Sequence, residues 1–276
     1  MTATVLNQKQ LIYLTGMSQP SIKAPPFVRY VVYFNGQNAA AVVPPNPAFY
    51  GSQLTVVAWF AIISNPGSWL GVVSTSVYTI DNWWVITGRG GVCQAGAGVA
   101  YTNGNVGDMY PLVNCGEVHQ YAFTINGNDF TMYFDGNRYR SFTGSGDLKF
   151  NPRIPLVIGG RPHGPFPVPP YDFSNVAVWQ VLVYNRALSD VEIAQLYSNP
   201  TNPIREGLVL WLQADPAYIK GSTWLDLSGN NNNATLYNTQ LIQLAPSIPW
   251  FWVGVGAATA IAVGAGLWIA HNKGLI

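Results

Sequence analysis

Charged side chains are scarce in this sequence of 276 residues. Asp, Glu, Lys and Arg make up 9% of the chain, against about a quarter in an average soluble domain. The 13 basic and 12 acidic residues almost cancel, giving a formal net charge of +1, and the basic residues form no cluster. Neutralising a row of backbone phosphates requires clustered Lys and Arg side chains. The sequence therefore argues against nucleic acid as a partner.

Acidic residues are too few and too scattered for glycan hydrolysis, which uses two carboxylates across a cleft. Glu occurs only at Glu117, Glu192 and Glu206, and neither Glu117 nor Glu206 has an acidic neighbour two or four positions away. Asp190 lies near Glu192, but both fall at the start of a predicted helix, where negative charge suits the helix dipole. We therefore expect no catalytic residues and no enzyme activity.

The chain has two cysteines, Cys93 and Cys115, which flank a Gly-rich stretch. A hairpin or loop in this stretch could bring the two thiols together as a disulfide. Two free buried thiols are the alternative, because the spacing matches no metal or redox motif. The sequence leaves both states open.

Glycine, proline and aromatic residues are plentiful, and 49% of the chain is hydrophobic, which is ample for a buried core. Short apolar runs with alternating polarity recur between turn residues. Many short strands of this kind are typical of a β-sandwich or barrel. The expected strands are 30–34, 54–63, 83–87, 121–125, 130–134, 156–158 and 176–184.

Turn and capping residues mark two further elements. Asn126-Gly127 supplies positive-φ residues for a hairpin between the fourth and fifth of these runs, and Asp135-Gly136 then turns the chain again. One soluble helix is expected over 188–197. Ser189 can cap the amide of Glu192 there, while Glu192 reaches back to the Ser189 amide in a capping box.

Three sequence blocks resemble the laminin-G-like/concanavalin A-like jelly-roll family. They are VHQYAFTINGNDFTMYFDGNRY at 118–139, PLVIGG at 155–160 and VWQVLVYNRALSDVEIAQLY at 178–197. The stretches 31–43 and 54–62 are similar to the early strands of that family, whereas Val118 departs from its usual Trp. The resemblance implies an all-β concanavalin A-like jelly-roll sandwich with one short helix.

A second block, 207–238, resembles the opening strands of the same family but follows the helix. It either completes the same sandwich in permuted order or is the stub of a second copy. Completion is favoured, because so short a stub could not bury both faces of its own strands. We therefore predict a sandwich over 24–240, with 207–240 as its permuted or repeated opening segment. An extension over 1–23 precedes it and a linker over 241–249 follows.

The run WFWVGVGAATAIAVGAGLWIA at 250–270 contains no charge and matches the roughly 20 residues that span a bilayer. Tryptophans near its two ends suit an interfacial belt, and small residues repeat every four positions, as at helix contacts in membranes. We predict a transmembrane helix there, with the lipid bilayer as partner and 271–276 as a short tail. The membrane residues are Trp250, Trp252, Gly256, Ala260, Gly264 and Trp268. A buried core helix is the alternative.

Ligand sites are harder to place. Sugar binding needs aromatic rings beside hydrogen-bonding side chains, although each such residue could equally lie in the core or contact a neighbouring subunit. The glycan candidates are Trp69, Trp83, Trp84, Tyr101, Asn103, Asn105 and Asp108.

A polar segment near the end of the predicted sandwich offers oxygen ligands. Asp226, Ser228, Asn230 and Asn232 could hold calcium, the one cofactor considered, and a polar turn with Asx-type hydrogen bonds is the alternative. Asn233 begins a glycosylation sequon.

The N-terminus lacks a basic start followed by an apolar stretch, so we expect no secretory leader. A C-terminal anchor without a leader ordinarily leaves the domain in the cytoplasm, which conflicts with a role at a cell surface. A virus with an internal membrane resolves the conflict, because a protein that faces the host cytoplasm during assembly ends up between membrane and capsid or projects outward. The first interpretation is therefore a non-enzymatic membrane-anchored structural or attachment protein, plausible as a minor capsid or surface protein of such a virion, with capsid or sister subunits as partners. The alternative is a glycan-binding lectin or adhesin on a cell surface.

Overall fold

The computed structural model describes residues 20–64, 70–76, 83–87, 91–162, 164, 170 and 172–244, with the side chains of 83–87 excepted. Within these ranges no helix is long and apolar enough to cross a membrane. The predicted transmembrane run 250–270, with all six of its membrane residues, lies outside the described residues, and so does Trp69.

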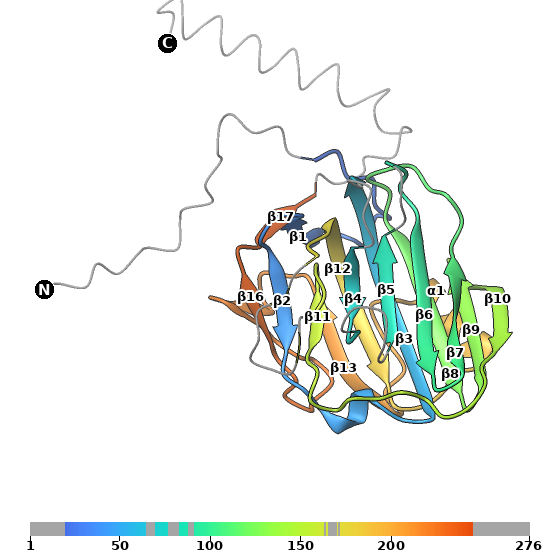
Figure 1. Cartoon of the computed structure of the whole chain (residues 1–276). Helices are drawn as coiled ribbons and strands as arrows, with labels where there is room; N and C mark the ends of the chain where they lie inside the picture. Colours follow the sequence, from blue (N-terminus) through green and yellow to red (C-terminus); the bar gives the residue numbers. More distant parts are fainter. Residues whose placement is uncertain are drawn as a thin grey trace, which may run out of the picture.

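The described strands form two antiparallel sheets that pack face to face (Figure 1). The first sheet has the order β10-β9-β8-β3-β12-β1-β17, with β13 also paired to β12. Its strands are β1 (Tyr30–Asn35), β3 (Gln53–Ser64), β8 (His119–Asn126), β9 (Asp129–Phe134), β10 (Asn137–Thr143), β12 (Asn175–Tyr184), β13 (Leu208–Gln213) and β17 (Gln240–Gln243).

The second sheet has the order β14-β15-β16-β2-β11-β4-β5-β6-β7. Its strands are β2 (Ala40–Val43), β4 (Gly71–Ser74), β5 (Trp83–Thr87), β6 (Ala95–Tyr101), β7 (Gly104–Met109), β11 (Leu156–Ile158), β14 (Ile219–Lys220), β15 (Thr223–Trp224) and β16 (Ala234–Tyr237). A short 3-10 helix, η1 (Pro47–Phe49), follows β2. The expected strands are all present, which confirms the all-β sandwich.

The core lies between the sheets because successive residues of a strand point to opposite faces. Along β8, Tyr121 and Phe123 are fully buried, and the Tyr121 ring stacks on Phe60 of β3 with centroids 4.3 Å apart. At the β10–β7 edge, an ion pair between Arg140 and Asp108 links the two sheets. Because Tyr121 and Phe123 of β8 point into this core, the opposite face of β8 is free to carry polar side chains.

The two predicted hairpin turns differ in detail. Asp135 (φ 45°) and Gly136 (φ 77°) form the expected positive-φ turn between β9 and β10. Between β8 and β9, however, Asn126 pairs with Asp129, so the loop residues are 127 and 128. Only Gly127 has a positive φ, of 60°. The turn sits one residue later than predicted because the strand ladder extends through Asn126.

The segment after the helix adds strands to both sheets. β13 pairs with β12, β16 pairs with β2, and β17 pairs with β1. These pairings complete one sandwich rather than begin a second. β17 runs to Gln243, past the expected domain end at 240, and Lys23 of the expected extension bridges to Glu117. Strand pairing, which sequence blocks do not reveal, sets these limits.

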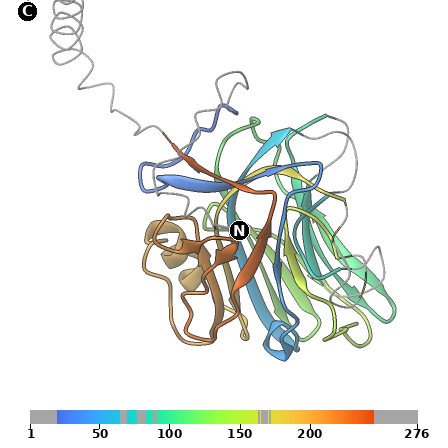
Figure 2. The same cartoon turned by 90° about the vertical axis from the view of Figure 1, so that its left-hand side faces the viewer.

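Helix α1 (Asp190–Ser198) packs on the outer face of the first sheet, away from the second (Figure 2). The predicted capping box is confirmed, with Ser189 as the cap in an extended conformation. The helix therefore begins at Asp190 and not at 188. The ring of Tyr197 stacks on that of Trp59 of β3, with centroids 5.4 Å apart. This packing fixes α1 beside β8, β9 and β10.

Candidate ligand-binding groove

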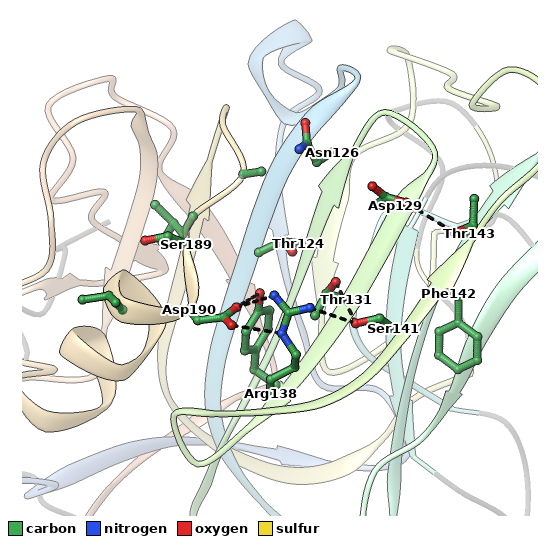
Figure 3. Close-up of a pocket in the computed structure, with 14 residues that line it drawn as sticks. Thr124, Asn126, Asp129, Thr131, Arg138, Ser141, Phe142, Thr143, Ser189 and Asp190 are labelled. Carbon is green, nitrogen blue, oxygen red and sulfur yellow. Dashed lines mark hydrogen bonds and ion pairs between the residues drawn. The ribbon is translucent and has the colours of Figure 1, made fainter.

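A groove of about 690 Å³ opens on the outer face of the first sheet, between β8–β10 and the start of α1 (Figure 3). Most of its lining side chains carry a hydroxyl, an amide or a charge. The lining residues are Thr124, Asn126, Asp129, Thr131, Tyr133, Arg138, Ser141, Phe142, Thr143, Ala187, Leu188, Ser189, Asp190 and Val191.

Strand register builds a row of hydroxyl groups across the groove. Thr124 of β8 pairs with Thr131 of β9, and Thr131 pairs with Ser141 of β10. Residues opposite one another in a ladder point to the same face. The register shifts between Arg138 and Arg140. Thr124 and Thr131 are buried in the floor, whereas Ser141 is exposed at the rim.

The groove wall is fixed by an ion pair between β10 and α1. Arg138 donates from Nε to Asp190 Oδ2 at 3.0 Å and from Nη2 to Asp190 Oδ1 at 2.8 Å. Tyr133 donates its hydroxyl to Asp190 Oδ1 at 2.8 Å. Arg138 Nη1 also donates to Ser141 Oγ at 3.3 Å, and the Thr131 and Ser141 hydroxyls lie 3.2 Å apart. Figure 3 shows this continuous hydrogen-bond network across the groove.

The protonation states in the groove follow from these contacts. The hydrogen bond from Arg138 holds the pKa of Asp190 below its ordinary value, with a further contribution from Tyr133. Burial raises the pKa of the Tyr133 hydroxyl. Asp190 is thus a carboxylate and Tyr133 a neutral phenol at neutral pH. An ionised Asp190 cannot protonate a leaving group, so it does not suit general acid catalysis.

The described glycan candidates lie elsewhere, on β5–β7 of the second sheet and in the turn between β6 and β7. Tyr101 is fully buried and donates its hydroxyl to the Gly127 carbonyl at 3.2 Å. Asn103 donates to Ser145 Oγ at 3.3 Å, and Asn105 is exposed on β7. Asp108 forms its ion pair with Arg140. No described residue of this set lines the groove.

Trp83 and Trp84 belong to β5, and their side chains lie outside the description, as Trp69 does entirely. A glycan role for the predicted set stays a prediction. The sequence signal for the groove was one Thr or Ser in each of three neighbouring strands, Thr124, Thr131 and Ser141. Only the strand register shows that these residues lie side by side on one face of the sheet.

The calcium candidates form a loop whose oxygen atoms accept hydrogen bonds from the chain itself. Asp226 Oδ1 accepts from the amides of Trp211 and Ser228, each at 2.9 Å. Asp226 Oδ2 accepts from Ser228 Oγ at 2.8 Å and from the Asn232 amide at 2.9 Å. Asn230 donates its side-chain amide to the Leu208 carbonyl at 3.1 Å.

These contacts match the polar-turn alternative. Both oxygens of the carboxylate that would anchor the ion are occupied by backbone and hydroxyl donors. Across the described part of the chain, no group of three His, Cys, Asp or Glu side chains could hold a metal ion.

Two candidate covalent sites remain, of which the disulfide was left open against free thiols. The structure joins Cys93 and Cys115 in a disulfide, with Cα atoms 5.3 Å apart. Asn233, the glycosylation candidate, is half-buried and accepts a hydrogen bond from the Asp226 amide at 2.8 Å. The disulfide closes the loops at the ends of β6 and β7.

Comparison with known proteins identifies the family. The sequence profile of Laminin_G_3, the concanavalin A-like lectin/glucanases superfamily, matches residues 34–194. No curated protein matches the chain. Among solved structures, one from Bacteroides ovatus ATCC 8483, named for a presumed carbohydrate-binding function, aligns with a TM-score of 0.57 and 17% identity. The alignment covers 79% of this chain and 61% of that one, so this chain spans less than two thirds of that protein's length.

Two further structures are more distant. The binding domain of Paraclostridial Mosquitocidal Protein 1 aligns with a TM-score of 0.49 and 15% identity over 62% of this chain and 44% of that one. A heptameric SAP-like pentraxin from Limulus polyphemus has a TM-score of 0.46 and 14% identity over 65% of this chain and 85% of its own. The profile match spans more than half of the chain, and the chain therefore belongs to the concanavalin A-like lectin/glucanases superfamily.

Proposed function

We propose that this chain is a non-enzymatic recognition protein that binds glycans in the groove between β10 and α1. The observation that carries the proposal is the row of hydroxyl groups from Thr124 through Thr131 to Ser141, joined to the Arg138–Asp190 pair. A sugar hydroxyl both donates and accepts hydrogen bonds, as Ser and Thr hydroxyls do. Exposed members of such a network can therefore exchange water for sugar hydroxyls.

Chemistry in the groove argues for binding over hydrolysis. Of the two carboxylates that line it, Asp190 is paired with Arg138 and has a lowered pKa. A glycan hydrolase needs one carboxyl group with a raised pKa to protonate the leaving oxygen. The name of the Bacteroides ovatus protein, which shares the fold, is in keeping with carbohydrate binding.

A glycan array tests this proposal. The full-length chain in a nonionic detergent should bind a subset of immobilised glycans, and an Arg138→Ala variant should give a weaker signal on the same glycans. Reducing-sugar release from the bound glycans should stay at background. Hydrolysis of those glycans, or an array without any signal, would contradict the proposal.

Membrane attachment is the second part of the proposal. The uncharged run 250–270 supports it, because its length matches a bilayer's hydrocarbon core. The full-length chain should float with lipid vesicles in a density gradient, whereas a chain that stays at the bottom would refute attachment.

The proposed setting is a virion that contains a membrane, with a cell-surface lectin as the alternative. Mass spectrometry of purified virions should then detect the chain. Its presence only in cellular membranes would favour the alternative.

A further inference from the structure

The charges that line the groove do not balance. Its lining holds two carboxylates, Asp129 and Asp190, and one guanidinium, Arg138. Both oxygens of Asp190 accept hydrogen bonds from Arg138, so this pair is neutral as a unit. Asp129 accepts a hydrogen bond from Thr143 at 3.3 Å, and among the described residues no Lys or Arg forms an ion pair with it. The groove therefore has a net charge of about −1 when its carboxylates are ionised.

The N-terminus of α1, which forms part of the groove wall, is already occupied by negative groups of the chain. The N-terminus of a helix favours negative groups because its first amides are unpaired and its dipole is positive there. In α1 the Ser189 hydroxyl accepts from the Glu192 amide at 3.3 Å, and Asp190 and Glu192 place two carboxylates in the first turn. A ligand anion would meet these carboxylates rather than free amides.

Three of the five N–H donors of Arg138 are already in use. Its Nε and Nη2 groups donate to Asp190, and Nη1 donates to Ser141. A sulfate or carboxylate that took the two-point contact with Nε and Nη2 would have to displace Asp190, which also accepts from Tyr133. Displacement would break the hydrogen bonds that Asp190 accepts from Arg138 and Tyr133. The hydroxyl row has no such conflict with uncharged ligands.

We infer that the groove selects neutral glycans over otherwise identical glycans that carry a sulfate or carboxylate group. This inference rests on the proposed glycan-binding function and specifies its ligand class. The discrimination arises from Asp129, the unbalanced carboxylate at the rim, together with the occupied helix start. Neutral oligosaccharides supply hydroxyl groups that match the Ser and Thr side chains without adding charge.

Paired titrations test the inference. Calorimetry on the full-length chain in nonionic detergent would use a neutral oligosaccharide that binds on the array and the same oligosaccharide with one sulfate. We expect the sulfated form to bind about tenfold more weakly at low salt, which is the scale of one like-charge contact in a partly screened site. The difference should shrink as salt screens the charges.

Variants assign the effect to the groove. Asp129→Lys changes the net charge of the groove from about −1 to about +1 and should reduce or reverse the preference. Glu206→Lys makes the same change of charge at an exposed residue outside the groove and should keep it. Asp129→Asn, a milder change, provides an intermediate should the lysine variant fail to fold.

Three results would overturn the inference. The sulfated oligosaccharide could bind the unsubstituted chain as tightly as the neutral one, which leaves glycan binding itself intact. The Glu206→Lys variant could change the preference as much as Asp129→Lys does, which would assign the effect to overall charge. Failure of both oligosaccharides to bind would instead reject the proposed function, and the inference with it.

Discussion

Two arginine–carboxylate pairs flank the start of α1, and they differ in burial and in setting. Arg186 donates to both oxygens of Glu192 at 2.6 and 3.1 Å, and the two side chains are 21% and 27% exposed. Arg138 donates to both oxygens of Asp190 at similar distances, but these side chains are 55% and 52% exposed. The same chemistry therefore occurs once in a partly buried position, the inner pair, and once at the exposed edge of the groove, the outer pair.

The two pairs therefore differ in what they can contribute to stability. Glu192 also accepts from the Ser189 amide and hydroxyl, and Arg186 donates to the Glu206 carbonyl, so this pair holds the helix start and the segment after it. Exposed ion pairs such as Arg138–Asp190 contribute little to folding because solvent screens them. We conclude that the first pair holds the helix start in the fold, whereas the second shapes the wall of the groove.

The largest expected effect comes from breaking the inner pair. Glu192→Ala removes one half of the capping box and leaves Arg186 without its carboxylate. The free energy of unfolding should fall by about 2–3 kcal/mol, with glycan affinity nearly unchanged. Denaturant unfolding of the full-length chain in detergent measures this. Gln195→Ala, an exposed change in the same helix, is the control, and equal stability of the two variants would contradict the account.

Acid should weaken the inner pair next. The hydrogen bond from Arg186 lowers the pKa of Glu192 from 4.5 to about 2. A carboxyl group whose pKa is lower in the folded state stabilises the fold above its ordinary pKa, and this stability is lost as the pH falls. Stability should therefore decline from about pH 5 to about pH 2, and less steeply in Arg186→Gln. Parallel pH profiles for the two proteins would show that Glu192 is not the group responsible.

Breaking the outer pair should lower glycan affinity more than it lowers stability. Arg138→Ala removes the donor to Asp190 and to Ser141 at the groove wall. Glycan affinity should fall about tenfold, while the free energy of unfolding falls by less than about 1 kcal/mol. Calorimetry and denaturant unfolding of one preparation give both numbers. A large loss of stability with intact binding would reverse the roles assigned to the two pairs.

The smallest effect should come from the rim of the hydroxyl row. Ser141→Ala removes one exposed hydroxyl that accepts from Arg138 and leaves the ion pair in place. Affinity should fall about threefold to fivefold, the scale of one modest hydrogen bond, without a measurable change in unfolding. Ser145→Ala, an exposed serine that does not line the groove, is the matched control. Equal affinity of both variants would exclude the row from binding.

The inner pair and the outer pair also differ in how far the sequence could predict them. The capping box depends on residues three apart, Ser189 and Glu192, so local pattern was sufficient to predict the cap. The groove joins three strands and a helix, and its hydroxyl row follows from the pairings of Thr124, Thr131 and Ser141. Register across strands is a tertiary property, and it includes a shift after Arg138 that no local pattern indicated.

The sandwich itself was predictable because apolar alternation and turn residues are local signals. The hairpin turn after β8 was misplaced by one residue, since the ladder continues through Asn126 to pair with Asp129. The last segment was assigned to the same sandwich by a size argument, and its partner strands β12, β2 and β1 became evident only in the structure.

The most direct test of the central claim is a calorimetric titration of the full-length chain with a neutral oligosaccharide selected on the array, alongside Arg138→Ala and Glu192→Ala. The account predicts that Arg138→Ala binds about tenfold more weakly and that Glu192→Ala, below its unfolding transition, binds like the unsubstituted chain. Equal binding by the unsubstituted chain and Arg138→Ala would contradict the claim that the groove between β10 and α1 is the glycan site.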